Sequence, residues 1–236
     1  MNGSIKSFFV GEKQCHVYSF HKPNMDSVDT VYVLDGDQFE TRLEEIETHM
    51  DFDSCRPFRL VFFDPVDWNR EYSPWPAQAV FRNGEPFSGQ AGRTLSFLSE
   101  QLIPEVQKRY STCNSPHHRG VIGYSLGGLC ALWLLHSSNL FGYGAACSPS
   151  VWYEGWLDFV KQNPFSNEVR LYLSLGKKEE KTRNSQMSHV GDVMRSLEVL
   201  YQNSPNVSKL FLEWNEGGHF QDVSLRIAKG LQWILS

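Results

Sequence analysis

One short segment of the chain carries the residue types of a nucleophilic active site. Residues 123–127 read Gly-Tyr-Ser-Leu-Gly, and the apolar helical run 126–136 begins within this segment. Where a strand turns sharply into a helix, a serine in a strained backbone conformation projects its hydroxyl above the sheet edge. A Cβ on Gly123 or Gly127 would collide with the neighbouring strand or helix. The pattern predicts a nucleophile elbow at Ser125, and the alternative is a glycine-rich turn without chemistry.

A serine hydroxyl is a weak nucleophile at neutral pH, so it needs a base within hydrogen-bond reach and a third group that orients the base. In folds with such an elbow, the chain order is serine, then an acid, then a histidine after the last strand. His219 fits this order because it follows the apolar run 207–214 and precedes the last helical pattern. Gly217 and Gly218 would let its loop turn the imidazole over the sheet edge. We therefore expect His219 to be the general base.

The acid should follow the apolar run 168–175, where residues 176–181 read Gly-Lys-Lys-Glu-Glu-Lys. Glu179 is the predicted acid, because a carboxylate next to the imidazole would stabilise the imidazolium that forms during acyl transfer. The segment could also be a solvated charge run, which would contribute little. Four other carboxylates remain alternatives for this role: Glu180, Glu213, Glu216 and Asp192.

The tetrahedral intermediate of acyl transfer needs backbone N–H donors directed at its oxyanion. Leu126 supplies one, because it directly follows the nucleophile. The second is expected from the loop after the strand 28–34, where the chain reads Leu-Asp-Gly-Asp over residues 34–37. We predict the backbone N–H of Asp37 as this donor from its position alone.

Length and composition limit the architecture and the partners. A chain of 236 residues suffices for one α/β domain with a full core, so residues 1–236 are expected to form a single domain. The net charge is −5 and no run of lysine or arginine exceeds a pair, so nucleic acid is not an expected partner. No apolar stretch reaches about 18 residues and no signal-peptide pattern opens the chain, which predicts a cytoplasmic protein without membrane attachment. The oligomeric state is left open.

The five cysteines are scattered and show no CxxC spacing, so the sequence indicates neither a disulfide framework nor a thiolate zinc site. Residues 66–90 have no sustained hydrophobic period and four nearby prolines, which predicts a long surface loop with a functional role. Residues 148–167 are too few for an independent helical cap. We therefore expect an open site without a large cap domain.

Apolar runs alternate with helical patterns along most of the chain, which predicts an α/β fold with a mostly parallel central sheet and helices on both faces. The expected strands are residues 5–10, 16–20, 28–34, 58–64, 118–123, 142–147, 168–175 and 207–214. The first two of these strands should form an antiparallel pair. The expected helices are residues 38–49, 92–110, 126–136, 185–202 and 220–235.

Six segments, in a common order, resemble the esterases related to enterochelin esterase, a branch of the α/β-hydrolases that also includes esterase D-like enzymes. They are LDGDQFE at 34–40, NREYSPW at 69–75, FLSEQLIPEV at 97–106, GYSLGGL at 123–129, CSPSVWY at 147–153 and GGH at 217–219. So many ordered segments are far more specific than GxSxG alone. The resemblance implies the α/β-hydrolase fold.

The resemblance also implies ester hydrolysis through an acyl-enzyme on Ser125, with His219 as base, the acid after Gly176, and no metal or organic cofactor. It implies a substrate pocket near four residues: Arg70, Tyr72, Trp75 and Trp152. The substrate is a small-molecule ester, left open between a siderophore-type ester and a small acyl ester. Two alternatives remain, a thioesterase similar to S-formylglutathione hydrolase and a non-catalytic ligand-binding protein on a hydrolase scaffold.

Overall fold

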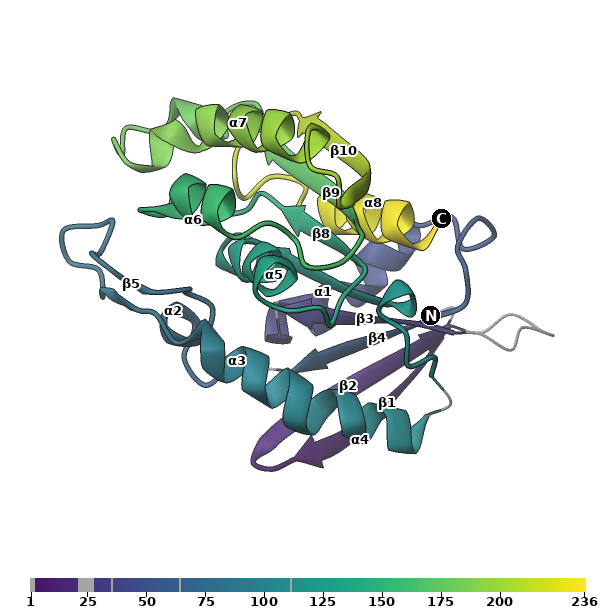
Figure 1. The fold of residues 1–236 in the computed structure, drawn as a ribbon. Helices are drawn as coiled ribbons and strands as arrows, with labels where there is room; N and C mark the ends of the chain where they lie inside the picture. The colour runs from purple at the N-terminus through teal and green to yellow at the C-terminus, as the bar shows by residue number, and fades with distance from the viewer. Residues whose placement is uncertain (1–2, 21–27, 35, 64, 111) are drawn as a thin grey trace.

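The computed structural model describes residues 3–20, 28–34, 36–63, 65–110 and 112–236, and only the backbone of residues 36–40. Eight strands form the central sheet: β1 (Ser4–Val10), β2 (Lys13–Phe20), β3 (Asp29–Leu34), β4 (Phe58–Phe63), β7 (Arg119–Tyr124), β8 (Tyr143–Cys147), β9 (Val169–Gly176) and β10 (Val207–Asn215). Their order across the sheet is β1-β2-β4-β3-β7-β8-β9-β10 (Figure 1). β2 pairs antiparallel with both β1 and β4, and the remaining neighbours are parallel.

The helices of the structure follow the same alternation. They are α1 (Gly36–Thr48), α2 (Trp68–Glu71), α3 (Ala91–Phe97), α4 (Ile103–Arg109), α5 (Leu126–Ser137), α6 (Trp156–Gln162), α7 (Val190–Gln202) and α8 (Val223–Leu235). Short 3-10 turns lie at Pro116–His118, Glu179–Lys181 and Met187–His189. A mostly parallel sheet covered by helices, without a large cap domain among the described residues, confirms the predicted α/β-hydrolase fold class.

The sheet separates two hydrophobic cores. One core lies under α1 and α8 and contains Leu43, Ile46 and Leu231. The other core lies under the remaining long helices and contains Leu102, Leu129 and many neighbours. Helix α5 is apolar on nearly every face because it packs on β7 and β8 and is itself covered, as its sequence predicts. This burial holds in place the N-terminal end of α5, which directly follows Ser125.

Several elements differ from the sequence predictions. The helix expected at 185–202 is α7, which begins at Val190 after a 3-10 turn. The helix expected at 92–110 is α3 and α4 joined by a π-helical segment at Leu98–Leu102, because Pro104 lacks an N–H and disturbs the preceding turn. The short helix α6 was not predicted. Helix α8 begins at Val223 rather than at 220, because Asp222 has a left-handed backbone with φ of 53°. The chain from His219 to Asp222 is therefore a loop at the sheet edge.

The predicted loop 66–90 is an ordered surface segment with small elements of its own. It contains α2 and a two-stranded sheet of β5 (Pro76–Ala77) and β6 (Phe87–Ser88). The hydroxyl of Ser73 accepts a hydrogen bond from Gly89 N at 2.9 Å and donates to Asn69 O. These bonds hold the two ends of the segment together beside the carboxyl ends of the strands.

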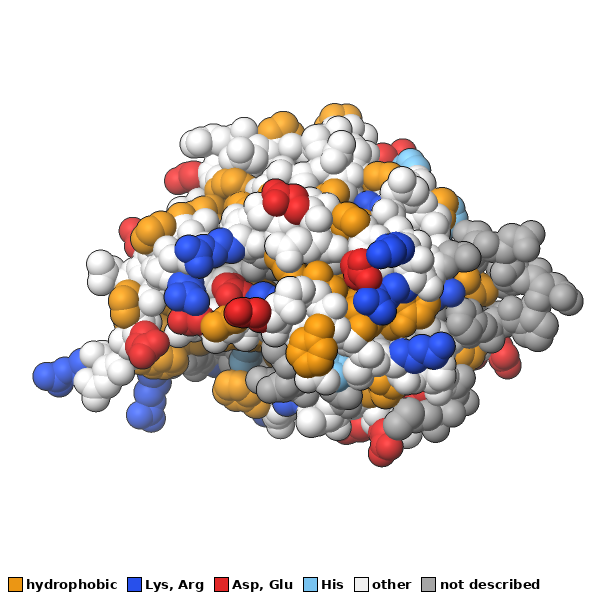
Figure 2. Space-filling view, turned by 90° about the horizontal axis from the view of Figure 1, so that it is seen from below, with side chains coloured by type: hydrophobic (Ala, Val, Ile, Leu, Met, Phe, Trp, Pro, Cys, Tyr) orange, Lys and Arg blue, Asp and Glu red, His pale blue; other side chains and the backbone are white. Residues whose placement is uncertain are grey.

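The described surface and helices give two further observations. Seen from below, the face in Figure 2 intersperses basic, acidic and hydrophobic side chains, without a large region of one charge sign. In the part of the chain that the structure describes, no helix has the length and apolar character needed to span a bilayer. The histidine, cysteine and carboxylate side chains of the same residues form no cluster suited to a metal ion.

Candidate active site

Ser125 lies at the turn between β7 and α5. Its φ of 54° and ψ of −121° are a strained backbone conformation for a residue with a side chain. The serine N–H donates to Cys147 O on the neighbouring strand at 3.1 Å, and the serine carbonyl accepts from Leu129 N and Ser150 N. These bonds on both sides of the turn hold the strain in place.

The two glycines beside Ser125 are required by close backbone approach. A Cβ on Gly127 would lie 2.0 Å from Leu34 O at the end of β3, and a Cβ on Gly123 would lie 2.2 Å from Gly127 O. Both distances are far below van der Waals contact, which confirms the predicted steric reason for glycine. The elbow therefore packs directly against the end of β3.

Gly127→Ala is expected to lower the free energy of unfolding by at least about 3 kcal/mol, because the strand and helix backbones must move apart. Gly92→Ala in α3 is the matched control, since a Cβ there meets nothing within 4 Å. This control should raise stability by about 0.5 kcal/mol through its better helix propensity. Urea denaturation of both variants measures the difference, and equal midpoints would contradict the steric argument.

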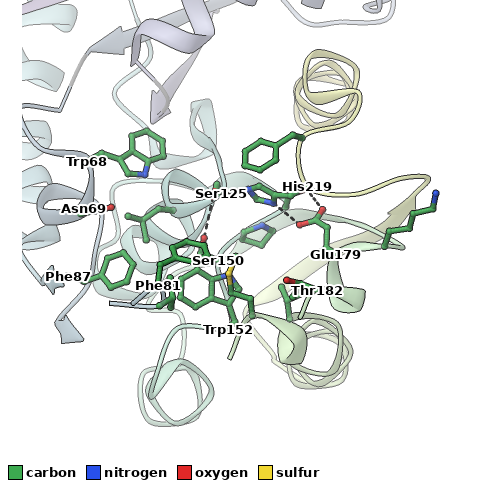
Figure 3. Close-up of a pocket in the computed structure, with 18 residues that line it drawn as sticks. Trp68, Asn69, Phe81, Phe87, Ser125, Ser150, Trp152, Glu179, Thr182 and His219 are labelled. Atoms are coloured by element: carbon green, nitrogen blue, oxygen red, sulfur yellow. Dashed lines mark hydrogen bonds and ion pairs between the residues drawn. The ribbon is translucent and has the colours of Figure 1, made fainter. Parts of the chain in front are cut away.

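Ser125, His219 and Glu179 come together at the carboxyl ends of the strands (Figure 3). His219 Nε2 lies 3.0 Å from Ser125 Oγ, and His219 Nδ1 lies 2.7 Å from Glu179 Oε2. With Nδ1 carrying the hydrogen, the ring donates to the carboxylate and Nε2 is free to accept from the serine hydroxyl. The arrangement can deprotonate the serine as it attacks an electrophilic carbon.

Glu179 is nearly buried, with 6% of its side chain exposed. Burial by itself would raise the pKa of this carboxyl, but hydrogen bonding and charge attraction from His219, with further bonds from Gly176 N and Ser148, hold the pKa below its ordinary value. Oε1 accepts from Gly176 N and from Ser148 Oγ, both at 2.8 Å. The carboxylate is therefore ionised at neutral pH and directed at the imidazole.

Arg226 of α8 supplies the charge that faces this carboxylate. Its side chain is fully buried, and Nη1 lies 2.9 Å from Glu179 Oε1. Nη2 donates to the carbonyl oxygens of Glu216 and Gly218, each at 2.9 Å. One guanidinium thus ties the acid to the loop that carries His219.

Tyr124 supports the same loop from β7. Its hydroxyl donates to His219 O at 2.6 Å. Burial raises the pKa of Tyr124 to about 12, so the phenol keeps its proton as a donor at neutral pH. The left-handed Gly217, with φ of 85°, lets the loop turn back over the sheet edge, as its sequence predicts.

The alternative carboxylates point to other partners. Glu180 pairs with Arg195 at 2.9 Å, and Asp192 pairs with the same arginine at 3.1 Å. Glu213 pairs with Lys229, and Glu216 pairs with Lys177 on the surface. Among the described side chains considered for the acid, Glu179 is the one in contact with His219.

Leu126 and Asp37 both lie in the first turn of a helix, where backbone N–H groups have no intrahelical acceptor. Leu126 begins α5, and Asp37 follows Gly36 at the start of α1. The structure therefore places Asp37 in a helix that begins directly after β3 rather than in the expected loop; Asp35 and the Asp37 side chain lie outside what is described. Their use as oxyanion donors remains a prediction.

A cavity of about 450 Å³ opens beside Ser125 and His219. Of the four residues expected to contact substrate, Trp152 lines this cavity. Among the described residues, the wall includes Trp68 and Asn69 but not Arg70.

Tyr72 and Trp75 are packing residues instead. Tyr72 is fully buried against Trp68, with ring centroids 4.9 Å apart. Trp75 packs against Trp156 and donates its indole N–H to Glu154 O at 2.9 Å. Along the one-turn helix α2, neighbouring positions point in different directions, so Trp68 and Asn69 line the cavity and Arg70 does not. Trp75 lies beyond this helix, where its contacts with Trp156 and Glu154 hold its ring.

Two kinds of site residue were missed from the sequence. Ser148 and Ser150 lie in the segment 147–153 that carried the family resemblance, where the serines were available as candidates. Arg226 lies on the buried stripe of α8 with Ile227 and Gly230. A charged residue on the sheet-facing stripe of a helix was the signal for it, because such residues are rarely buried without a partner.

One family model and several known proteins are similar to this chain. The Esterase family, described as "Putative esterase", matches residues 12–219. The uncharacterized protein YbbA of Bacillus subtilis is 28% identical over 242 residues, which cover 99% of this chain and 97% of YbbA.

Two solved structures are similar in fold. An IroE-like serine hydrolase from Shewanella oneidensis has a TM-score of 0.77 at 18% identity, covering 99% of this chain and 80% of that one. The siderophore hydrolase EstA from Aspergillus nidulans has a TM-score of 0.73 at 20% identity, covering 99% of this chain and 94% of that one. The family match covers residues 12–219, which is most of the chain and includes Ser125, Glu179 and His219. The protein therefore belongs to the Esterase family of enzymes.

Proposed function

We propose that this esterase is a serine carboxylic ester hydrolase that works through an acyl-enzyme on Ser125. The observation that carries the proposal is the continuous hydrogen-bond chain from Ser125 Oγ through His219 to Glu179, at an elbow that opens into a cavity. Nucleophile, base and orienting acid are the three parts that covalent ester hydrolysis requires.

In the proposed reaction, His219 Nε2 accepts the proton of Ser125 Oγ as the oxygen attacks the ester carbonyl carbon. Glu179 stabilises the imidazolium that forms, and the N–H groups of Leu126 and Asp37 face the oxyanion. The tetrahedral intermediate collapses as the imidazolium gives its proton to the leaving alcohol. Water then attacks the acyl-enzyme with the same base, which releases the acid and restores the serine.

A fluorophosphonate probe tests the covalent step directly. We expect one adduct per chain in the native protein, located on Ser125 by peptide mass spectrometry, because an activated serine attacks phosphorus as it attacks a carbonyl. Ser150→Ala is the matched control, since Ser150 Oγ lies 3.4 Å from Ser125 Oγ in the same cavity. Labelling that disappears in Ser150→Ala and persists in Ser125→Ala would show that Ser150 is the nucleophile and would contradict the proposal.

The substrate class is the finer part of the proposal. EstA carries the name siderophore hydrolase, which makes a siderophore-type ester one candidate for this chain. A small acyl ester and a thioester are the others, because the same three side chains serve each of them. Specificity constants for a siderophore trilactone, short p-nitrophenyl esters and S-formylglutathione rank these classes. A folded protein that turns over none of them and resists the probe would be a binding protein instead.

A further inference from the structure

The cavity beside Ser125 is lined by an aromatic cluster, which comprises Trp68, Phe81, Phe87, Trp152 and Phe220. These residues come from the segment 66–90, from the chain after β8 and from the loop after His219. Figure 3 shows Phe81, Phe87 and Trp152 gathered on one side of the catalytic serine, with Trp68 apart from them, beyond Asn69. Segments far apart in the sequence thus bring their rings to one hollow.

Two members of this aromatic cluster are exposed to solvent. Phe81 is 61% exposed and Phe220 is 88% exposed, although both line the cavity. Phenylalanine side chains that remain in water at the mouth of one cavity lose the benefit of burial in the free protein. Exposed apolar side chains gathered in this way mark a surface that a ligand covers.

The wall of the larger cavity carries few charged side chains. Among the described residues that line it, Lys178 is the one cationic Lys or Arg side chain and Glu179 is the one carboxylate. Glu179 is engaged by Arg226 and His219, so it offers no charge to a ligand. The described part of the wall contains no arginine that could pair a ligand carboxylate in the two-pronged geometry that such groups favour.

A smaller cavity of about 200 Å³ adjoins the larger one at the serine. It shares four lining residues with the larger cavity, Trp68, Ser125, His219 and Phe220, and adds Arg42, Tyr124 and Val223. Ser125 lines both cavities, so each can hold one side of a scissile ester. Phe81, Phe87 and Trp152 line the larger cavity and not the smaller one, so the part of the substrate that lies in the larger cavity meets these rings.

We propose that the larger cavity binds an uncharged aromatic or bulky apolar group of the ester substrate, with Phe81 and Phe220 covering it. This inference rests on the proposed ester hydrolysis and specifies which substrates that site selects. A volume of about 450 Å³ is far more than an acetyl group occupies and lies in the range of small-molecule sites. Rings of the ligand would stack or meet edge to face with those of the wall.

Two ester series test the proposal. One varies the acyl group of p-nitrophenyl esters (acetyl, benzoyl, 4-carboxybenzoyl), and the other varies the alcohol of acetate esters (ethyl, benzyl, 4-carboxybenzyl). In at least one series we expect the neutral ring ester to exceed both its small and its carboxylated counterparts about tenfold in kcat/KM. A preference for the carboxylated or the small ester in both series would overturn the inference.

Phe81→Ala and Phe9→Ala form a matched pair, because Phe9 on β1 is 63% exposed and lies outside the cavity. In Phe81→Ala, the kcat/KM ratio of the neutral ring ester to the small ester should fall about tenfold. Phe9→Ala should leave this ratio unchanged. Equal ratios in both variants would remove Phe81 from the binding surface.

Direct binding separates this inference from the proposed reaction. Tryptophan fluorescence of Ser125→Ala should titrate with the neutral ring ester, since Trp68 and Trp152 line the cavity, and about tenfold more weakly with the carboxylated analogue. Turnover of acetate esters with a labelled Ser125 but without the neutral ring preference would overturn the inference and keep the hydrolase. Preferential binding without turnover or labelling would keep the inference and overturn the hydrolase.

Discussion

Ser125→Ala is expected to lower kcat/KM for a p-nitrophenyl ester by about 10⁵-fold, because the variant lacks the oxygen that forms the acyl-enzyme. The oxyanion donors and the cavity remain, so a small residual rate above that of water should persist. Steady-state hydrolysis rates measure this loss of kcat/KM, after circular dichroism has shown that the variant and the wild type are equally folded. A variant that keeps more than about 1% of the activity would contradict a nucleophilic role.

Ser125→Gly separates the chemistry from the backbone strain at the same position. Both variants should be inactive, but glycine adopts the φ of 54° without the steric cost that alanine retains. Relief of this strain should make Ser125→Gly about 1 kcal/mol more stable than Ser125→Ala in urea denaturation. The reverse order of stability would show that the elbow is not strained.

Glu179→Gln is expected to lower kcat/KM by about 10⁴-fold, the second largest effect. A neutral amide does not stabilise the imidazolium, and its N–H₂ group can face His219 Nδ1 and favour the wrong tautomer. Hydrolysis rates and the extent of fluorophosphonate labelling should fall together. Labelling at the wild-type rate would contradict the predicted role of the acid.

The adjacent carboxylate is a stringent control for this variant. Glu180→Gln removes the same charge one residue away, in an exposed pair with Arg195, so the rate should change less than about twofold. Glu179→Gln also leaves Arg226 buried without its carboxylate, and stability should fall by about 3 kcal/mol. The rates are therefore compared well below both melting temperatures. Similar losses of kcat/KM in the two variants would contradict the assignment of Glu179 as the acid.

The elements around the site could be predicted because their signals are local. The glycines at 123 and 127, the apolar run before them and the helical run after them all lie within a few turns of chain, and each constrains the backbone by itself. His219 was accessible for a similar reason, since a glycine loop between the last strand and the last helix has a defined place in this chain order. The start of α8 was predicted three residues too early because Asp222 has a left-handed backbone, which hydrophobic periodicity does not indicate.

The identity of the predicted acid and the residues of the cavity wall could be determined only from the three-dimensional structure. Glu179 and Glu180 are neighbours with the same chemistry, and the 3-10 turn at Glu179–Lys181 directs one to His219 and the other to Arg195. Arg226 lies in a helix that looks ordinary in sequence. The role of Arg226 depends on its contact with Glu179, which is 47 positions away in the sequence, and local patterns do not encode such a contact.

The sequence by itself determined the alternation of strands and helices, the elbow at Ser125 and the loop of His219, because backbone preferences and hydrophobic periods act over short stretches of chain. Only the tertiary structure decided which carboxylate meets the imidazole, that Arg226 holds it, and that Trp68 rather than Arg70 faces the cavity. Side-chain direction at these positions is set by packing between distant segments, where one residue along a helical turn changes the face that is presented.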